Sequence, residues 1–469
     1  MRDIHPPRPA RRNDRDGKRR SRALGIAAFF AVAGLALPAA SEEASPAETS
    51  AAHGFERSYT AGVRDAHDQL LGGTEVGYLV AHKGRLYAAA GLLWDAPGDE
   101  PDPVKGAQIL VLDRPDGQWR LEKEFSPNFW RVTALGSVTF AIDGHGKALA
   151  EPVNLLVAGP IDEDGGGYVY SRDDATGEWA ASRIVSGERR TSFRCFYLYR
   201  DKVTGVDRLF AGNRPYGIFS GVYDAESPSR IRWNEQPEVT TEGIRPMAFA
   251  ECQGALYAIV YNDLYRRIDG PSARWEKIYT VDRDLAPEGS GLRGLTTISD
   301  PSGKGELMLA ALEGQYSRVV RIDPAGPRVT VELDVAQFLE DRWGARPGYM
   351  IVAYNNMVEV TDSAGAKHHI LGVHAQRRPM AKEVPTSGWE AEGYYLIRHA
   401  DGTYDLGQIV DPRLDSMPPL VAVKAIALSP FGSPAVYFGG FDPYHRPSHN
   451  TAWIFSGPLE TVLSGTQGR

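Results

Sequence analysis

The hydrophobic positions of the chain recur in short runs rather than at helical spacing. From residue 76 onward, a short apolar strand is followed by a turn, a second strand ending in small residues, a variable loop, and then a polar hairpin. The second strand is the most regular part of this pattern. It occurs seven times, as RLYAAAG (85–91), NLLVAG (154–159), RLFAG (208–212), ALYAIV (255–260), ELMLAAL (306–312), HILGVH (369–374) and AVYFGG (435–440).

The polar hairpins complete each repeat. Asp and Gly supply the turns, and Trp119, Trp179 and Trp275 open the strand that follows. The hairpins are clearest at 110–125, 168–185, 265–281 and 319–335. Four strands in about 50 residues is the spacing of propeller blades, so the sequence predicts an all-β, seven-bladed β-propeller, with a solenoid or a sandwich as the alternatives. The best helix signal, AQFLEDRW at 336–343, lies in a connection between repeats.

Two segments resemble known propeller repeats. VYFGGFD (436–442) is similar to the diglycine strand of kelch repeats, and SRDDATGEW (171–179) resembles a loosened Asp box. The other repeats lack the glycine pair or the serine. The resemblance therefore concerns architecture across the domain and implies no particular activity.

The N-terminal region predicts export. The first 22 residues are rich in Arg and Lys, and the apolar stretch 23–36 is too short to span a bilayer comfortably. KRRSRALG (18–25) resembles a twin-arginine signal without its usual continuation. We expect a signal peptide at 1–40, with an uncleaved anchor as the alternative, a disordered spacer at 41–58 and a single propeller domain at 59–469. The mature protein should be periplasmic or secreted, with no membrane contact beyond the signal segment.

Net charge and cysteine content limit the classes of binding partner and the covalent links that we expect. The net charge is −8, with 52 basic and 60 acidic residues, which disfavours nucleic-acid binding. The only cysteines are Cys195 and Cys252. The repeat places them at opposite ends of neighbouring first strands, about 20 Å apart along the strand direction, so we expect two free thiols. The sequence identifies no oligomeric state and no cofactor.

One end of the predicted propeller gathers functional side chains. Its loops are richer in His, Tyr and Arg than ordinary turns. The residues on these loops are Trp94, Asp95, Asp162, Glu163, Asp164, Asn213, Arg214, Tyr216, Tyr261, Asn262, Glu313, Tyr316, His374, Arg377, Arg378, Asp442, Tyr444, His445, Arg446, His449 and Asn450.

An arginine stands just before the first strand of five successive repeats. These residues are Arg131, Arg194, Arg245, Arg293 and Arg346, at intervals of 63, 51, 48 and 53 residues. Because the intervals match the repeat length, the five side chains should surround the mouth of a central channel. Unpaired guanidinium groups there would concentrate anions, whereas pairing with carboxylates of neighbouring repeats would make them structural.

The favoured function is action on, or binding of, an anionic polysaccharide. A lyase acting on uronic acids needs a cation beside the carboxylate, a base and an acid. The candidate bases are His374, His445 and His449, and the candidate acids are Tyr444 and Tyr216. The candidate substrate-binding residues are the five arginines, Asn213, Arg214, Asn262, Glu313, Arg377, Arg378, Asp442 and Arg446.

Two other functions remain open. A non-catalytic binding platform could use the aromatic loop residues Trp94, Phe129, Trp130, Tyr216 and Tyr444 to hold a sugar or a protein. A sialidase-like glycosidase would take two carboxylates from Asp162, Glu163, Asp164, Glu313 and Asp442. No metal ligands are assigned, since a divalent ion would have to join His374 to His445 or His449 across two repeats.

Overall fold

The computed structural model describes residues 54–93, 104–185, 187, 189–286, 291–376, 392–442 and 450–465. Within these ranges the chain is antiparallel β-structure with two short helices, α1 (Val335–Trp343) and α2 (Leu459–Leu463). The predicted all-β class is confirmed. Neither of these helices is long and apolar enough to cross a membrane. The expected signal peptide lies outside the described residues.

Most strands form four-stranded antiparallel units in which each strand pairs with its neighbour. We call them meanders 1 to 7. Meander 1 consists of β4 (Glu75–His82), β5 (Arg85–Gly91), β6 (Gln108–Leu112) and β7 (Arg120–Glu124). Meander 2 consists of β8 (Val132–Ile142), β9 (Ala148–Pro160), β10 (Tyr168–Arg172) and β11 (Trp179–Arg183). Meander 3 consists of β12 (Ser192–Arg200), β13 (Asp207–Arg214), β14 (Gly217–Tyr223) and β15 (Ile231–Trp233).

The remaining meanders continue along the chain. Meander 4 consists of β17 (Pro246–Cys252), β18 (Ala255–Val260), β19 (Asp263–Ile268) and β20 (Arg274–Thr280). Meander 5 consists of β21 (Leu292–Ser299), β22 (Glu306–Leu312), β23 (Arg318–Asp323) and β24 (Arg328–Asp334). Meander 6 consists of β25 (Met350–Thr361), β26 (Lys367–Ala375), β27 (Tyr394–Arg398) and β28 (Tyr404–Gln408). Meander 7 contains β29 (Ala422–Leu428), β30 (Ala435–Phe441) and β31 (Trp453–Pro458).

The fourth strand of meander 7 comes from the other end of the described chain. β1 (Glu56–Thr60) pairs antiparallel with β31, and Phe55 packs against Tyr395 and Phe438 at ring-centroid distances of 6.2 and 5.8 Å. The strand begins inside the segment 41–58, which shortens the expected spacer. Three short strands lie outside this scheme: β2 (Val63–Arg64), β3 (Leu70–Leu71) and β16 (Val239–Thr240), which pairs with β14.

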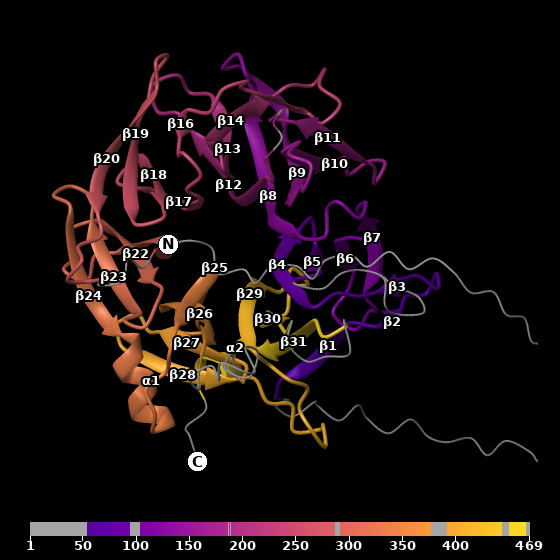
Figure 1. Ribbon diagram of the computed structural model, residues 1–469, viewed down its shortest axis with the longest axis vertical. Helices are drawn as coiled ribbons and strands as arrows, with labels where there is room; N and C mark the ends of the chain where they lie inside the picture. The colour runs from indigo at the N-terminus through magenta and orange to yellow at the C-terminus, as the bar shows by residue number, and fades with distance from the viewer. Residues whose placement is uncertain are drawn as a thin grey trace, which may run out of the picture. The chain divides into compact units, whose positions relative to one another are not determined.

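The first strands of the seven meanders contact one another in order. β4 lies beside β8, β8 beside β12, β12 beside β17, β17 beside β21, β21 beside β25, and β25 beside β29. β29 in turn contacts β4, so the series returns to the strand where it began. Figure 1 shows the other strands of each meander lying outside these first strands.

The second strands form the apolar core of each meander. They are β5, β9, β13, β18, β22, β26 and β30, and they contain the seven runs found in the sequence. In β18 all six residues are buried, and in β5 six of seven are buried. A strand buried on both faces needs apolar residues at successive positions, which is why these runs do not alternate.

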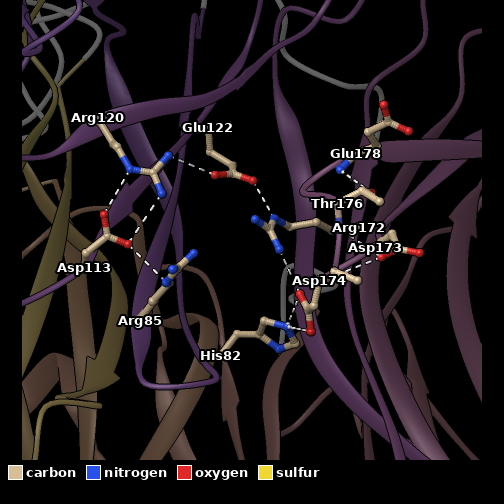
Figure 2. A network of polar contacts seen from close by, with 11 residues as sticks. His82, Arg85, Asp113, Arg120, Glu122, Arg172, Asp173, Asp174, Thr176 and Glu178 are labelled. Atoms are coloured by element: carbon tan, nitrogen blue, oxygen red, sulfur yellow. Dashed lines mark hydrogen bonds and ion pairs between the residues drawn. The ribbon is translucent and has the colours of Figure 1, made fainter.

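Buried ion pairs join neighbouring meanders. Three times, an arginine of a third strand binds a glutamate that precedes its own meander in the chain: Arg172 with Glu122 of β7, Arg267 with Glu238 just before β16, and Arg398 with Glu332 of β24. The nitrogen–oxygen distances are 2.5, 3.0 and 2.5 Å. Figure 2 shows the first of them, where Arg172 also contacts Asp174, which in turn binds His82. This Asp174 belongs to the segment that resembles an Asp box, so that segment here connects two meanders.

Local signals explain the other elements. Asp334 caps α1 by accepting a hydrogen bond from the backbone N–H of Gln337, and the helix ends at Gly344, which has φ 68°. The predicted helix at 336–343 is therefore present. Cys195 lies in β12 and Cys252 ends β17, and both are free thiols.

Candidate functional site

Each of the seven first strands carries a charged residue or a tyrosine within its first five positions or directly before them. We call these seven residues the polar cluster: Glu75 (β4), Arg131 (before β8), Arg194 (β12), Arg245 (before β17), Arg293 (β21), Tyr354 (β25) and Lys424 (β29). Because the first strands contact one another in order, their N-terminal ends bring these side chains together.

Irregularities in strand pairing lie close to these side chains. Every first strand has a register shift near its start. Arg194 and Lys424 are themselves the extra residues of two such bulges, between Phe193 and Cys195 and between Val423 and Ala425. Bulges redirect a side chain that regular pleating would point elsewhere. In the other four strands the shift lies beside the cluster residue and does not contain it.

The largest departure is in β25. Val352 pairs with Val373 and Met357 with Leu371, so residues 353–356 stand opposite a single residue. The excursion reaches three other meanders. The carbonyl of Tyr354 accepts a hydrogen bond of 3.0 Å from Arg194, the Asn355 amide donates to the carbonyl of Gly77, and Asn356 donates to that of Ile426 at 3.2 Å. Tyr354 is thus held among the first strands.

Glu75 joins two cations of the cluster. Its carboxylate contacts the guanidinium of Arg131 and the ammonium of Lys424. Burial alone would raise the pKa of Glu75, but Arg131 and Lys424 hold it below its ordinary value. Burial and Arg131 lower the pKa of Lys424 to about 8 against the opposing effects of Glu75 and Tyr354. Lys424 therefore titrates much closer to neutrality than an exposed lysine.

Tyr354 is surrounded by positive charge. The Lys424 nitrogen lies 4.4 Å from its ring centroid, and the guanidinium carbons of Arg194 and Arg293 lie at 4.5 and 5.1 Å. Burial would raise the pKa of the phenol, but these three cations and Arg131 together hold it well below its usual range. A phenol in this setting can give up its proton far more readily than tyrosine in water.

Arg245 is the least compensated cation of the cluster. Among the described residues, none forms an ion pair or a hydrogen bond with its guanidinium, although its Nε is buried. Burial, with Arg194, Arg214 and Arg293 nearby, lowers its pKa to about 9. Buried charges in proteins are normally paired, because desolvation without a partner is costly.

Arg293 is paired at the edge of the cluster. Its Nε lies 2.5 Å from a carboxylate oxygen of Glu313, a residue predicted to bind substrate. Tyr349 also interacts with this carboxylate, and burial followed by Glu313 raises the pKa of its phenol. The cluster and its edge therefore contain five cationic side chains, two carboxylates (Glu75 and Glu313) and the phenol of Tyr354.

His374 borders the cluster in a buried position. Its ring lies 5.0 Å from that of Phe441 and 6.1 Å from that of Tyr354. Burial, then Lys424 and Arg293, lowers its pKa to about 3, so the imidazole is neutral at ordinary pH and weakly basic. The role predicted for His374 as a base remains a prediction.

The structure does not bring Arg346 into the cluster. Its guanidinium forms an exposed ion pair of 3.0 Å with Glu340 of α1, and Tyr354 takes the corresponding position in β25. Arg346 stands four residues before β25 begins, and its pair with Glu340 directs its side chain toward α1.

Several predicted residues lie near the same strand ends without joining the cluster. Asn213 and Arg214 end β13, Tyr216 follows in the next turn, and Asn262 lies in the turn after β18. Asp442 directly follows β30 and is fully buried. Eight more lie outside the described residues: Trp94, Asp95, Arg377, Arg378, Tyr444, His445, Arg446 and His449.

The acidic loop 162–164 is engaged in structural contacts. The carboxylate of Asp162 accepts hydrogen bonds from the backbone N–H groups of Asp164 and Gly166. Glu163 accepts from the indole of Trp130 at 2.6 Å and pairs with Arg190. The catalytic role considered for these carboxylates remains a prediction.

Sequence reasoning missed three members of the cluster. Glu75 and Lys424 each stand inside an otherwise apolar run, TEVGYLV and AVKAIAL. A charge within an apolar strand was the signal that could have found them, because buried charges are rare without a role. Tyr354 gave no comparable signal, since aromatic residues are common in strands.

We compared the sequence with protein families and with curated proteins. No protein-family profile matches the chain, and no curated protein matches it. Among the described residues, no group of three or more His, Cys, Asp or Glu is arranged to hold a metal ion.

Solved structures show distant likenesses. An extracellular domain of a hybrid two-component system from B. thetaiotaomicron aligns with 12% identity and a TM-score of 0.47 over 86% of this chain, which spans 39% of that protein. A chain assigned as an exo-β-1,3-galactanase of Bifidobacterium bifidum s17 aligns with 9% identity and a TM-score of 0.29, covering 86% and 92% of the two chains. BBS1N, solved in complex with ARL6DN, aligns with 10% identity and a TM-score of 0.43, covering 87% and 97%.

Proposed function

We propose that this chain is an exported, seven-bladed β-propeller that binds an anionic carbohydrate at its polar cluster. The propeller is supported by the series of contacts between first strands, which returns from β29 to β4, and by β1, which completes meander 7. Export is supported by the basic and apolar segments at the N-terminus.

The observation that carries the binding function is the excess of cations in the polar cluster. Arg131 and Lys424 pair with Glu75, and Arg293 pairs with Glu313. Among the residues that the structure describes, Arg194 and Arg245 pair with no carboxylate. An anion placed beside Arg245 would supply the missing charge. Because guanidinium groups bind carboxylates through two parallel hydrogen bonds, the uronic acids of acidic polysaccharides are the ligands we favour.

A second candidate function, elimination at a uronic acid, is favoured by the position of Tyr354. In this reaction a base removes the proton on the carbon beside the carboxylate, the electron pair forms a carbon–carbon double bond, and the glycosidic oxygen leaves. The Tyr354 phenolate would take that proton and return it to the leaving oxygen. The arginines would neutralise the substrate carboxylate, which makes the proton more acidic.

Calorimetric titration with short oligomers of galacturonic, glucuronic and mannuronic acid tests the binding function. We expect saturable binding by the wild type and a loss of about 10- to 100-fold in Arg245→Met, the usual value of a charge-assisted hydrogen bond. Arg346→Ala is the matched control, because it removes an exposed arginine outside the polar cluster. Sulfated and phosphorylated sugars are included to distinguish a carboxylate site from a general anion site.

The outcomes separate the candidates. No binding of any acidic oligomer, or equal losses in Arg245→Met and Arg346→Ala, would contradict the proposed site. Growth of the ultraviolet absorbance of an unsaturated sugar, abolished in Tyr354→Phe while binding persists, would establish elimination. Binding without that absorbance would leave a binding protein.

A further inference from the structure

A serine, a histidine and an aspartate form a chain of contacts between meanders 1 and 2. His82 is the last residue of β4, Ser137 lies within β8, and Asp174 lies in the turn between β10 and β11. Nδ1 of His82 is 2.8 Å from Oγ of Ser137, and Nε2 is 3.1 and 3.0 Å from the two carboxylate oxygens of Asp174. Figure 2 shows the imidazole and this carboxylate facing each other.

The contacts of the imidazole determine which of its nitrogens carries the proton. Burial would raise the pKa of Asp174, but Lys83, at 2.9 Å, and His82 hold it below its ordinary value. An ionised carboxylate only accepts hydrogen bonds, so Nε2 of His82 carries the proton. Nδ1 then presents its lone pair to Ser137, and the serine hydroxyl donates to it.

His82 can therefore accept a proton from Ser137. Burial lowers the pKa of His82 against the opposing effect of Asp174, so the imidazole is neutral at ordinary pH. A hydroxyl that donates to a neutral imidazole, whose other nitrogen is held by a carboxylate, is the arrangement that activates a serine nucleophile. The two ring nitrogens have the opposite roles in serine proteases, but an imidazole can accept a proton at either one.

Packing alone does not require the contact between the serine and the histidine. Ser137 is an exposed residue, so water could satisfy its hydroxyl. The charge of Asp174 is balanced by Lys83 and Arg172, each at 2.9 Å. The exposure of Ser137 also allows a small molecule to reach its Oγ from solvent.

We propose that Ser137 is a nucleophile for the hydrolysis of carboxylic esters with small acyl groups, with His82 as its general base and Asp174 positioning the imidazole. Oγ of Ser137 bonds to the carbonyl carbon as its proton passes to Nδ1 of His82. The bond from that carbon to the alcohol oxygen then breaks, and the alcohol leaves with this proton. Water attacks the acyl-serine by the same route, releases the acid and restores the hydroxyl.

The position of Ser137 limits the substrate and separates this site from the polar cluster. Because β4 and β12 lie on either side of β8, we expect acyl groups the size of acetyl rather than long chains. Ser137 is six residues beyond Arg131, or about 20 Å at strand rise. The proposal is therefore independent of the function proposed for the polar cluster.

Labelling of the full chain with a fluorophosphonate, followed by mass spectrometry, tests the nucleophile. We expect one phosphonate per chain, on Ser137, and hydrolysis of p-nitrophenyl acetate that this labelling abolishes. Ser137→Ala should lose both reactions, and His82→Gln should slow labelling about 10²- to 10⁴-fold, the usual contribution of a general base. Ser302→Ala is the matched control, because it removes an exposed serine whose hydroxyl hydrogen-bonds to Asp300, and it should react as the wild type does.

Asp174→Asn tests the positioning role. An amide no longer fixes the proton on Nε2, so we expect the labelling rate at saturating reagent to fall as it does in His82→Gln. The half-saturating concentration of the reagent should stay unchanged, which a general loss of structure would not allow.

Three results would overturn the proposal. The first is a wild type that the fluorophosphonate does not label, and the second is labelling that persists in Ser137→Ala. The third is an unchanged labelling rate in folded His82→Gln or Asp174→Asn, which would show that the contacts of the imidazole only join the two meanders. Circular dichroism and the melting temperature of each variant establish that it is folded.

Discussion

Arg245 combines a ligand-binding position with a cost to stability. Its buried Nε has no hydrogen-bond partner among the described residues, and burial among other cations lowers its pKa to about 9. We expect Arg245→Met to raise the free energy of unfolding of the ligand-free protein by about 1 kcal/mol, since an uncompensated charge is replaced by an apolar group of similar length.

Urea unfolding of the wild type and of Arg245→Met measures this difference directly. A variant less stable than the wild type would show that Arg245 already has a stabilising partner. The same variant binds acidic oligomers less well if the proposed function is correct, so stability and binding should change in opposite directions.

Lys424 should make anion binding depend on pH. Burial and Arg131 lower its pKa to about 8, so the ammonium loses its proton as the pH rises through this value. Loss of a cation weakens attraction for an anion, and we therefore expect affinity to fall between about pH 7 and pH 9. A bound anion favours the charged form and would shift the fall to higher pH.

Lys424→Met supplies the comparison for this titration. Its affinity should be lower at pH 7 and should change little between pH 7 and pH 8, so that the remaining fall toward pH 9 belongs to Arg245. If the wild type and Lys424→Met showed the same pH profile, the dependence would belong to another group.

At the scale of elements, buried arginine–glutamate pairs hold neighbouring meanders together. Glu332 of β24 binds Arg398 of β27 and Arg321 of β23, and it accepts a hydrogen bond from Tyr404. Glu332→Gln leaves Arg398 buried without its counter-charge. We expect this change to lower the free energy of unfolding by about 3 kcal/mol, and we expect Arg398→Met in the same chain to recover part of the loss.

Thermal and urea unfolding of the single and double variants test the pair. Glu276→Gln is a matched control, because its pair with Arg274 is exposed on both sides and such pairs contribute about 1 kcal/mol or less. Similar effects of Glu276→Gln and Glu332→Gln would mean that burial does not strengthen the inter-meander pair.

The elements themselves were largely readable from the sequence. The seven apolar runs are the second strands, and the predicted outer hairpins are the third and fourth strands of meanders 1, 2, 4 and 5. Period and turn chemistry are local, which is why they could be read residue by residue. The bulges in the first strands could not be, because a bulge shows only when a strand is compared with its partner.

At the scale of the whole molecule, β1 connects the two ends of the described chain. Phe55 and Tyr59 are 5% and 4% exposed, and β1 is the outer strand of meander 7. We expect removal of residues 1–61 to lower the free energy of unfolding by about 6 kcal/mol or more, because the loss of each of two buried aromatic side chains costs about 3–5 kcal/mol. Removal of residues 1–53 is the control and should leave the melting temperature unchanged.

Differential scanning calorimetry of the two truncated chains decides this prediction. Equal melting temperatures would show that β1 is dispensable and that meander 7 is stable with three strands. A broad or split transition in the shorter chain would show that β1 also maintains cooperative unfolding.

The sequence by itself determined the number and order of the repeats, the all-β class and four arginines of the polar cluster, because each depends on periodicity along the chain. Only the tertiary structure decided that Glu75, Tyr354 and Lys424 join those arginines and that Arg346 does not. The physical reason is that membership depends on where seven strand ends from distant parts of the chain meet and, for Arg194, Tyr354 and Lys424, on how an irregularity turns the side chain. Neither the place where the strand ends meet nor the bulges produce a periodic pattern in the sequence.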